Sequence, residues 1–442
     1  MLSGTTVLIL VGLIEACVTV GEPASLCQIQ GSPEFPVLSK EGDVMIGGAF
    51  SIHTLSNVLH DLLVGRKHNI LLCYSSFSIN LREFRFAQTM IFAIEEINNK
   101  KDLLPNISIG YRIYDNCAST LSSMRAAMAL MNGHELTLGN GCSGQSAVHA
   151  IIGESESSST IFSVLFICLQ ISHSATCECL SSRKEYPAFF RTIVSDLYQS
   201  RALAQLVKHF GWTWVGAVNS DNDYGNNGMA IFLSAAQEEG VCVEYTEKFD
   251  RAEPEKLLKV IEVIKKSTAR VIVGFLSHVE MNNLLEQLSL HNITGRQFIG
   301  VEAWITADSL VTPTSFSVLG GALGFAVQKA NISGLEDFLV RGFWETEFLC
   351  NGTNRESVLR TCKENPDLFQ LKGHDDGLEK LRYPTNIYKA IYAVAHSLHN
   401  ILKCSDKKGC DKALEIKPWE FPSQTIRRLC CWDGTVNSTE GL

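Results

Sequence analysis

The sequence has no surplus of basic residues and no long apolar run beyond its first 20 residues. Its 442 residues include 38 basic and 47 acidic side chains, which give a formal net charge of −9. This balance argues against a nucleic-acid partner, because a phosphate-backbone binder needs a basic face. No later stretch reaches the ~18 continuous apolar residues of a membrane helix. Hydrophobic residues make up 45% of the chain, which excludes a disordered protein.

The common catalytic signatures are also missing. The sequence contains no Walker loop, no GxGxxG after a strand, no HExxH and no GxSxG elbow. His149, His173 and His209 stand in no arrangement that would activate a nucleophile. We therefore expect a protein that is not an enzyme.

Two short motifs could bind a metal ion. Cys177 and Cys179 form a Cys-x-Cys pair, but no second pair has zinc-finger spacing, so a disulfide in a surface loop is the favoured role. Asp221 and Asp223 are weak candidates for calcium, with a solvated acidic turn as the alternative, because the EF-hand pattern is absent. We expect no cofactor, with calcium as the one possible ion.

Cysteine and glycosylation motifs indicate a secreted chain. The 15 cysteines suit an oxidising compartment. An apolar stretch from Val7 to Ile14 predicts a signal peptide over residues 1–20, with a buried N-terminal segment as the alternative. Asn-x-Ser/Thr motifs occur at Asn106, Asn292, Asn331, Asn351 and Asn437.

Apolar periodicity alternates between helix and strand along most of the chain. Residues 84–100 have apolar side chains at helical spacing, and residues 106–117 alternate as a strand does. After residue 195 the pattern predicts helices over 198–212, 227–239, 254–267 and 278–292, strands over 213–218, 241–245, 270–276 and 297–301, and a late helix over 386–403. Such βα repeats build parallel sheets covered by helices. We expect a two-lobed α/β fold with a mostly parallel sheet in each lobe.

Polar turns follow four of the apolar strands. They cover residues 153–160, 173–178, 220–228 and 300–304, and are rich in Ser, Thr, Asp, Asn or Gly. Ligands of open parallel sheets bind beyond the carboxyl ends of the strands. The four turns together favour a polar ligand in a cleft between two lobes, although each alone could be an ordinary βα turn.

Long segments of the chain match one receptor family. They are NLREFRFAQTMIFAIEEINN, LLPNISIGYRIYDNC, HAIIGESESSS, ISHSATCECLSSRKEYPAFFRT, LVKHFGWTWVGAVNSDNDYGNNGM, GVEAW and YKAIYAVAHSLHNILKC. From about residue 80 to about residue 415, the chain closely resembles the ectodomains of class C G-protein-coupled receptors. It is most similar to the vomeronasal type-2-like (fish olfactory) receptors, a group near the extracellular calcium-sensing receptor.

The resemblance implies a Venus-flytrap domain that closes on an amino acid or a related small ligand. Lobe 1 would comprise residues 21–194 and 326–417, lobe 2 residues 195–325, and residues 418–442 an atypical tail. The full receptor would lie on the extracellular side of the plasma membrane, form homo- or heterodimers through lobe 1, and reach a heterotrimeric G protein through an absent seven-helix domain. A secreted, non-signalling amino-acid-binding protein or a non-functional receptor fragment is the alternative.

The resemblance also assigns a ligand site. The family residue that holds the α-carboxylate falls on Ser157, beside Ser155 and Ser158. The next turn supplies a backbone carbonyl and a hydroxyl, which fall on Ser174 and Thr176. The α-amino group is assigned to Asp196 and Tyr224, the lobe-2 acid to Glu302, and the distal part of the ligand to Arg82. A zwitterion needs donors for its carboxylate and an acid or ring face for its ammonium. Without the family, Ser157 would be a turn hydroxyl and Asp196 a helix N-cap.

Family pairings imply the disulfides Cys350–Cys362 and Cys404–Cys410. The family partner of Cys117 falls on Ser76 in this sequence, so Cys73, which stands just before it, is the candidate partner. Cys242 should be unpaired, because its family partner lies in a cysteine-rich domain that this sequence lacks. Cys142 falls in the loop that links subunits covalently in calcium-sensing-like members. The segment over 160–170 is about four residues shorter than in the family, and the match ends near residue 420. We expect an incomplete or mis-spliced sequence, with a natural truncated form as the alternative.

Overall fold

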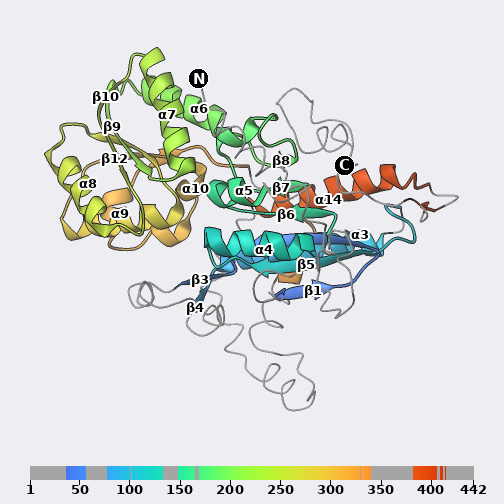
Figure 1. Ribbon diagram of the computed structural model, residues 1–442. Helices are drawn as coiled ribbons and strands as arrows, with labels where there is room; N and C mark the ends of the chain where they lie inside the picture. Colours follow the sequence, from blue (N-terminus) through green and yellow to red (C-terminus); the bar gives the residue numbers. More distant parts are fainter. Residues whose placement is uncertain are drawn as a thin grey trace, which may run out of the picture.

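The computed structural model describes residues 36–55, 77–100, 102–132, 148–164, 169–328, 330–339, 382–405, 409–411 and 414 (Figure 1). The expected signal peptide, the Cys350–Cys362 pair, Cys73, Cys142 and the tail over 418–442 lie outside these residues. Within them, no helix is long and apolar enough to cross a membrane.

A six-stranded sheet forms the centre of the first lobe. Its order is β1-β5-β2-β6-β7-β8, and only the β1–β5 pair is antiparallel. The strands are β1 (Leu38–Lys40), β2 (Val44–Phe50), β5 (Ile109–Asp115), β6 (Ala150–Ile152), β7 (Gln170–Ser172) and β8 (Phe189–Arg191). A separate antiparallel pair joins β3 (His53–Leu55) and β4 (Phe77–Ile79).

Helices cover both faces of this sheet. They are α3 (Leu81–Asn99), α4 (Thr120–Asn132), α5 (Ser157–Val164) and α14 (Pro384–Ile401). Residues of α3 and α14 share one apolar cluster with Ile46 of β2, whereas residues of α4 pack with Met45 on the opposite face. Successive residues of a strand point to opposite faces of the sheet. Because helices cover both faces here, every residue of β2 is buried, and this strand lies at the centre of the lobe.

A five-stranded parallel sheet forms the centre of the second lobe. Its order is β10-β9-β11-β12-β13. The strands are β9 (Trp214–Ser220), β10 (Cys242–Phe249), β11 (Val271–Phe275), β12 (Gln297–Gly300) and β13 (Leu323–Gly324). The surrounding helices are α6 (Asp196–His209), α7 (Asp223–Glu238), α8 (Pro254–Lys266), α9 (His278–Leu290), α10 (Glu302–Ile305) and α11 (Phe316–Leu319), with the 3₁₀ turn η3 (Asp308–Leu310). Another 3₁₀ turn, η2 (Glu178–Ser181), lies between β7 and β8 of the first lobe.

Local sequence explains these elements well in α8. Pro254 stands in its first turn, where a missing N–H costs nothing. Leu257, Val260, Ile261 and Ile264 recur at helical spacing and are buried against the second sheet. The two mostly parallel sheets confirm the expected α/β fold. The structure also differs from expectation in places: the central strand β2 was not anticipated, nor were short elements such as β1, β8 and β13, and α7 begins at Asp223 rather than near residue 227.

The chain leaves the first sheet after β8 and returns to it with α14, which packs beside α3 (Figure 1). The first lobe is therefore made from two separate parts of the sequence, and the second lobe lies between them. The lobe boundaries near residues 194 and 325 stay predictions.

Candidate ligand-binding site

The four expected polar turns all follow carboxyl ends of parallel strands, namely β6, β7, β9 and β12. Ser157, Asp196 and Glu302 are the first residues of α5, α6 and α10, and Tyr224 is the second residue of α7. Helix N-termini carry free N–H groups and favour negative charge nearby. Turns of the two lobes meet here, since the Cys177 sulfur lies 3.7 Å from the Asp223 carbonyl oxygen.

Asp196 is a buried carboxylate that lacks a full set of partners. Its side chain is almost completely buried, and no hydrogen-bond partner reaches Oδ2 in the described part of the chain. Burial raises its pKa to about 7, although a hydrogen bond with Thr176 and the charge of Arg191 oppose the shift. Ser195, rather than Asp196, caps α6, because its hydroxyl accepts the Leu197 N–H at 3.1 Å. The N-cap alternative for Asp196 is therefore wrong.

The hydroxyl groups around Asp196 differ in how far they are already bonded. Ser174 Oγ is buried and has no partner among the described residues. Ser157 Oγ accepts the Cys177 N–H at 3.2 Å, so its proton remains free to be donated. Ser155 Oγ donates instead to both oxygens of Glu83, at 2.8 and 2.9 Å. Ser174 and Ser157 can therefore receive an anion, whereas Ser155 is held in the protein interior.

A disulfide and an arginine hold the turn that carries Ser174 and Thr176 in place. Cys177 and Cys179 form a disulfide, and Cys177 is completely buried, so the expected surface-loop position is wrong for this residue. The guanidinium of Arg191 donates to the carbonyl oxygens of Thr176 and Cys177, at 3.2 and 2.9 Å. These contacts hold the Thr176 carbonyl in place, and that carbonyl also accepts the Asp196 N–H at 2.8 Å.

Tyr224 brings an aromatic ring from the second lobe toward the same carboxylate. Its ring centroid lies 5.0 Å from that of Phe275. Burial raises the pKa of Tyr224, and the negative charge of Asp196 raises it further, as do Glu280 and Glu302. Tyr224 is therefore influenced by the negative charges of both Asp196 and Glu302, which stand on two other helices.

Glu302 is attached to the segment that follows β13. Its Oε2 accepts the Val327 N–H at 2.6 Å, and Arg382 donates to the Val327 carbonyl oxygen. Burial raises the pKa of Glu302 to about 7, while the charges of Arg382 and Arg82 oppose the rise. Glu302 is thus placed both in the second lobe and against the returning chain.

Arg82 extends from α3 of the first lobe. Its side chain is exposed, and its guanidinium carbon lies 4.6 Å from the Tyr383 ring centroid. Burial lowers the pKa of His278 in the second lobe, and the Arg82 charge lowers it further. The charge of Arg82 is therefore felt by His278 and by Glu302, which both belong to the second lobe.

The calcium candidates are not brought together. Asp221 forms ion pairs with Lys248 at 2.9 Å and Lys256 at 3.4 Å, and a hydrogen bond from Lys248 lowers its pKa. Asp223 stands in the first turn of α7. Among the described residues, no group of three His, Cys, Asp or Glu could hold a metal ion. The geometry gives no support to calcium at this pair.

The remaining expectations concern cysteine and asparagine. Cys404 and Cys410 form a disulfide, and Cys242 is exposed and free. Cys117 takes part in a disulfide, and its expected partner Cys73 lies outside the described residues. Asn106, Asn292 and Asn331 are exposed, whereas Asn351 and Asn437 lie outside the described residues.

Glu154, three residues before Ser157, is a buried acid that was not identified from the sequence. Glu154 is almost completely buried, and its Oε2 accepts hydrogen bonds from the Asn116 amide at 2.5 Å and the Ser123 hydroxyl at 2.9 Å. Burial raises its pKa to about 8, so it is mostly protonated at neutral pH. The sequence offers little signal for this role, because Glu154 stands in a polar turn that looks exposed.

Comparison with known proteins identifies the family. Residues 85–430 match the family described as the receptor family ligand binding region. The chain belongs to this family. It is 30% identical over 444 residues to the extracellular calcium-sensing receptor of Bos taurus, a match that covers 86% of this chain and 40% of that receptor. It is 29% identical over 409 residues to taste receptor type 1 member 1 of Homo sapiens, covering 89% of this chain and 47% of that receptor.

These similarities show that this chain is an extracellular ligand-binding domain of a class C G-protein-coupled receptor, which is a non-enzymatic family. The chain spans 40% of the length of the calcium-sensing receptors that it matches. The Homo sapiens calcium-sensing receptor is likewise 30% identical, over 436 residues.

Proposed function

We propose that this receptor domain is chemosensory, of the vomeronasal type-2-like group, and binds a free amino acid or a close analogue between its lobes. The observation that carries the proposal is Asp196, a buried carboxylate with an unpartnered oxygen. Its N–H is bonded to Thr176 of the same turn that carries the buried, unpartnered hydroxyl of Ser174. Buried polar groups are normally hydrogen-bonded, because leaving them unpaired is costly. A ligand with an ammonium group next to a carboxylate would satisfy both.

The surrounding residues suit the two ends of such a ligand. Its ammonium would contact Asp196 and the Tyr224 ring, while its carboxylate would accept hydrogen bonds from Ser157 and Ser174. The Thr176 side chain is already hydrogen-bonded with Asp196 and would orient that carboxylate. Arg82 would lie toward the ligand's side chain. Glu302 would reach the ligand from the second lobe, so ligand contacts would favour the closed arrangement of the two lobes.

In the whole receptor, closure would be transmitted through a dimer formed by the first lobe to a seven-helix domain that couples to a G protein. The native setting would then be the extracellular face of the plasma membrane. The similarity to the calcium-sensing and taste type 1 receptors supports this larger assembly.

A thermal-shift screen over the common amino acids tests the ligand class. At 100 times its dissociation constant, a ligand that binds only the folded state adds about 2.7 kcal/mol to the free energy of unfolding. We expect a rise in melting temperature with at least one amino acid and none with its N-acetyl derivative, which lacks the ammonium group. The proposal fails if no amino acid shifts the transition, or if acetylated and free forms shift it equally.

Replacement of Glu302 should affect closure more than initial binding. In Glu302→Gln, the side-chain carbonyl can still accept the Val327 N–H, but the negative charge facing the ligand is lost. We expect a severalfold weaker affinity and a smaller ligand-induced compaction in small-angle X-ray scattering. Glu262→Gln, an exposed change on α8, is the control. Normal compaction in Glu302→Gln would contradict this role.

A further inference from the structure

An arginine of the second lobe reaches across to the first. Arg251 lies in the turn between β10 and α8. Its Nη2 donates to the carbonyl oxygen of Ala118 at 2.9 Å, and its Nη1 lies 4.0 Å from Glu156 Oε1. Ala118 follows β5, and Glu156 immediately precedes α5, so both acceptors belong to the first lobe. The guanidinium therefore joins the two lobes directly.

The accepting turn of the first lobe is held rigidly. Cys117 and Ala118 have φ values of 49° and 53°, in the left-handed region that non-glycine residues rarely adopt. Side chains maintain this conformation: Asp115 Oδ1 accepts the Cys117 N–H at 2.9 Å, and Asn116 Oδ1 accepts the Ala118 N–H at 3.1 Å. Asn116 is itself bonded to the buried Glu154. The Ala118 carbonyl is thus a fixed acceptor for a donor from the other lobe.

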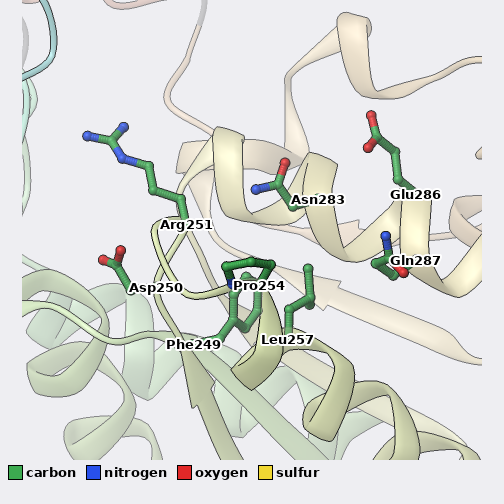
Figure 2. Close-up of a pocket in the computed structure, with 8 residues that line it drawn as sticks. All are labelled: Phe249, Asp250, Arg251, Pro254, Leu257, Asn283, Glu286 and Gln287. Carbon is green, nitrogen blue, oxygen red and sulfur yellow. The ribbon is translucent and has the colours of Figure 1, made fainter. Parts of the chain in front are cut away.

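On its own lobe, Arg251 borders a cavity of about 150 Å³ (Figure 2). Apolar side chains of Phe249, Pro254 and Leu257 line it, together with Asn283, Glu286 and Gln287 of α9 and Asp250. Figure 2 shows the guanidinium of Arg251 pointing away from Pro254 and Leu257. Two carboxylates, Asp250 and Glu286, are among the residues that line this cavity. Arg251 therefore borders acidic groups of its own lobe as well as Glu156 of the first lobe.

We infer that Arg251 is a latch that stabilises the closed arrangement by binding the Ala118 carbonyl and Glu156. This contact involves no ligand group, so it biases the ligand-free protein toward closure. The hydrogen bond is charge-assisted, which strengthens it. Because the side chains of Arg251 and Glu156 are 39% and 49% exposed, solvent screening weakens the ionic part of the contact.

The test measures the ligand-free chain by small-angle X-ray scattering, with the closed-to-open ratio taken from the distance distribution. Arg251→Ala should lower that ratio about three- to tenfold. Arg251→Lys should lie between wild type and alanine, because one ammonium cannot engage both acceptors as the planar fork does. Arg270→Ala is the matched control, since this exposed arginine of the same lobe has no side-chain bond to the first lobe among the described residues.

Identical scattering from Arg251→Ala, Arg270→Ala and wild type would overturn the latch. Circular dichroism spectra and thermal unfolding of the variants exclude a folding defect as the cause of a change. Failure of the latch can be distinguished from failure of the proposed amino-acid site. The scattering experiment contains no ligand, whereas the thermal-shift screen requires only that ligand stabilises the wild-type chain.

Discussion

Asp196→Ala is expected to weaken amino-acid binding by roughly ten- to hundredfold. A hydrogen bond to a charged group contributes about 1.5–3 kcal/mol, and this carboxylate has an oxygen with no protein partner in the described part of the chain. Tyr224→Ala should cost less, because a cation–π contact contributes about 0.5–2 kcal/mol. The expected order of the losses is therefore Asp196 above Tyr224.

Isothermal titration calorimetry with the amino acid that gives the largest thermal shift measures both losses. Asp337→Asn, which changes an exposed carboxylate, should leave affinity unchanged. The melting temperature of the ligand-free variant checks that it still folds. Removal of a buried, incompletely paired carboxylate should not lower this temperature. Unchanged affinity in Asp196→Ala would refute the assignment of this residue, while membership of the receptor family would stand.

Affinity for the amino acid should fall steeply as the pH is lowered from 8 to 5. The pKa of Asp196 is raised to about 7 in the ligand-free protein, and a bound ammonium would lower it by favouring the charged carboxylate. Protons then compete with the ligand below pH 7. The loss is about tenfold per pH unit for one such group, or about hundredfold at pH 5. Free amino acids remain zwitterions throughout this range.

Calorimetry at several pH values, with Asp196→Asn as the paired variant, checks this expectation. The variant should bind weakly and with a shallower pH dependence, the remainder arising from Glu302, whose pKa is also about 7. Equal slopes in wild type and variant would contradict the assignment. Acid unfolding through these groups does not explain the fall. A folded-state pKa above the unfolded one gives stability that is full below about pH 4 and is lost as the pH rises through 7.

The long helices α6 to α9 and the strands β9 to β12 of the second lobe could be predicted because their apolar residues follow a regular period. β2 could not, since VMIGGAF is buried on both sides and contains two glycines, so it shows no alternation. The beginning of α7 was also hidden, because DYGNNG is typical of a turn. In the structure, Asn222 caps the helix by accepting the Gly225 N–H at 2.9 Å. A Cβ on Gly228 would lie only 2.1 Å from the Phe275 ring, so close packing requires this glycine.

The candidate site was predicted mainly through the family resemblance. Residue types alone favoured a helix N-cap for Asp196, and local rules could not show that Ser195 takes this position. The unpartnered oxygen of Asp196 depends on how the turn over residues 173–179 is folded, and that turn is held by Arg191 and by a disulfide between Cys177 and Cys179. Such long-range contacts leave no periodic signal in the sequence. The same applies to Arg251, whose partner Ala118 is 133 residues away.

The late position of α14 in the chain has a consequence for synthesis. This helix packs against α3 in the main apolar cluster of the first lobe, but the ribosome makes it only after the whole second sheet. Domains generally fold as they emerge, beginning from the N-terminus. Here the second lobe, which is continuous from α6 to β13, can fold on the ribosome while one face of the first sheet still awaits its cover. The nascent first lobe would therefore expose apolar surface to lumenal chaperones until residues 384–401 arrive.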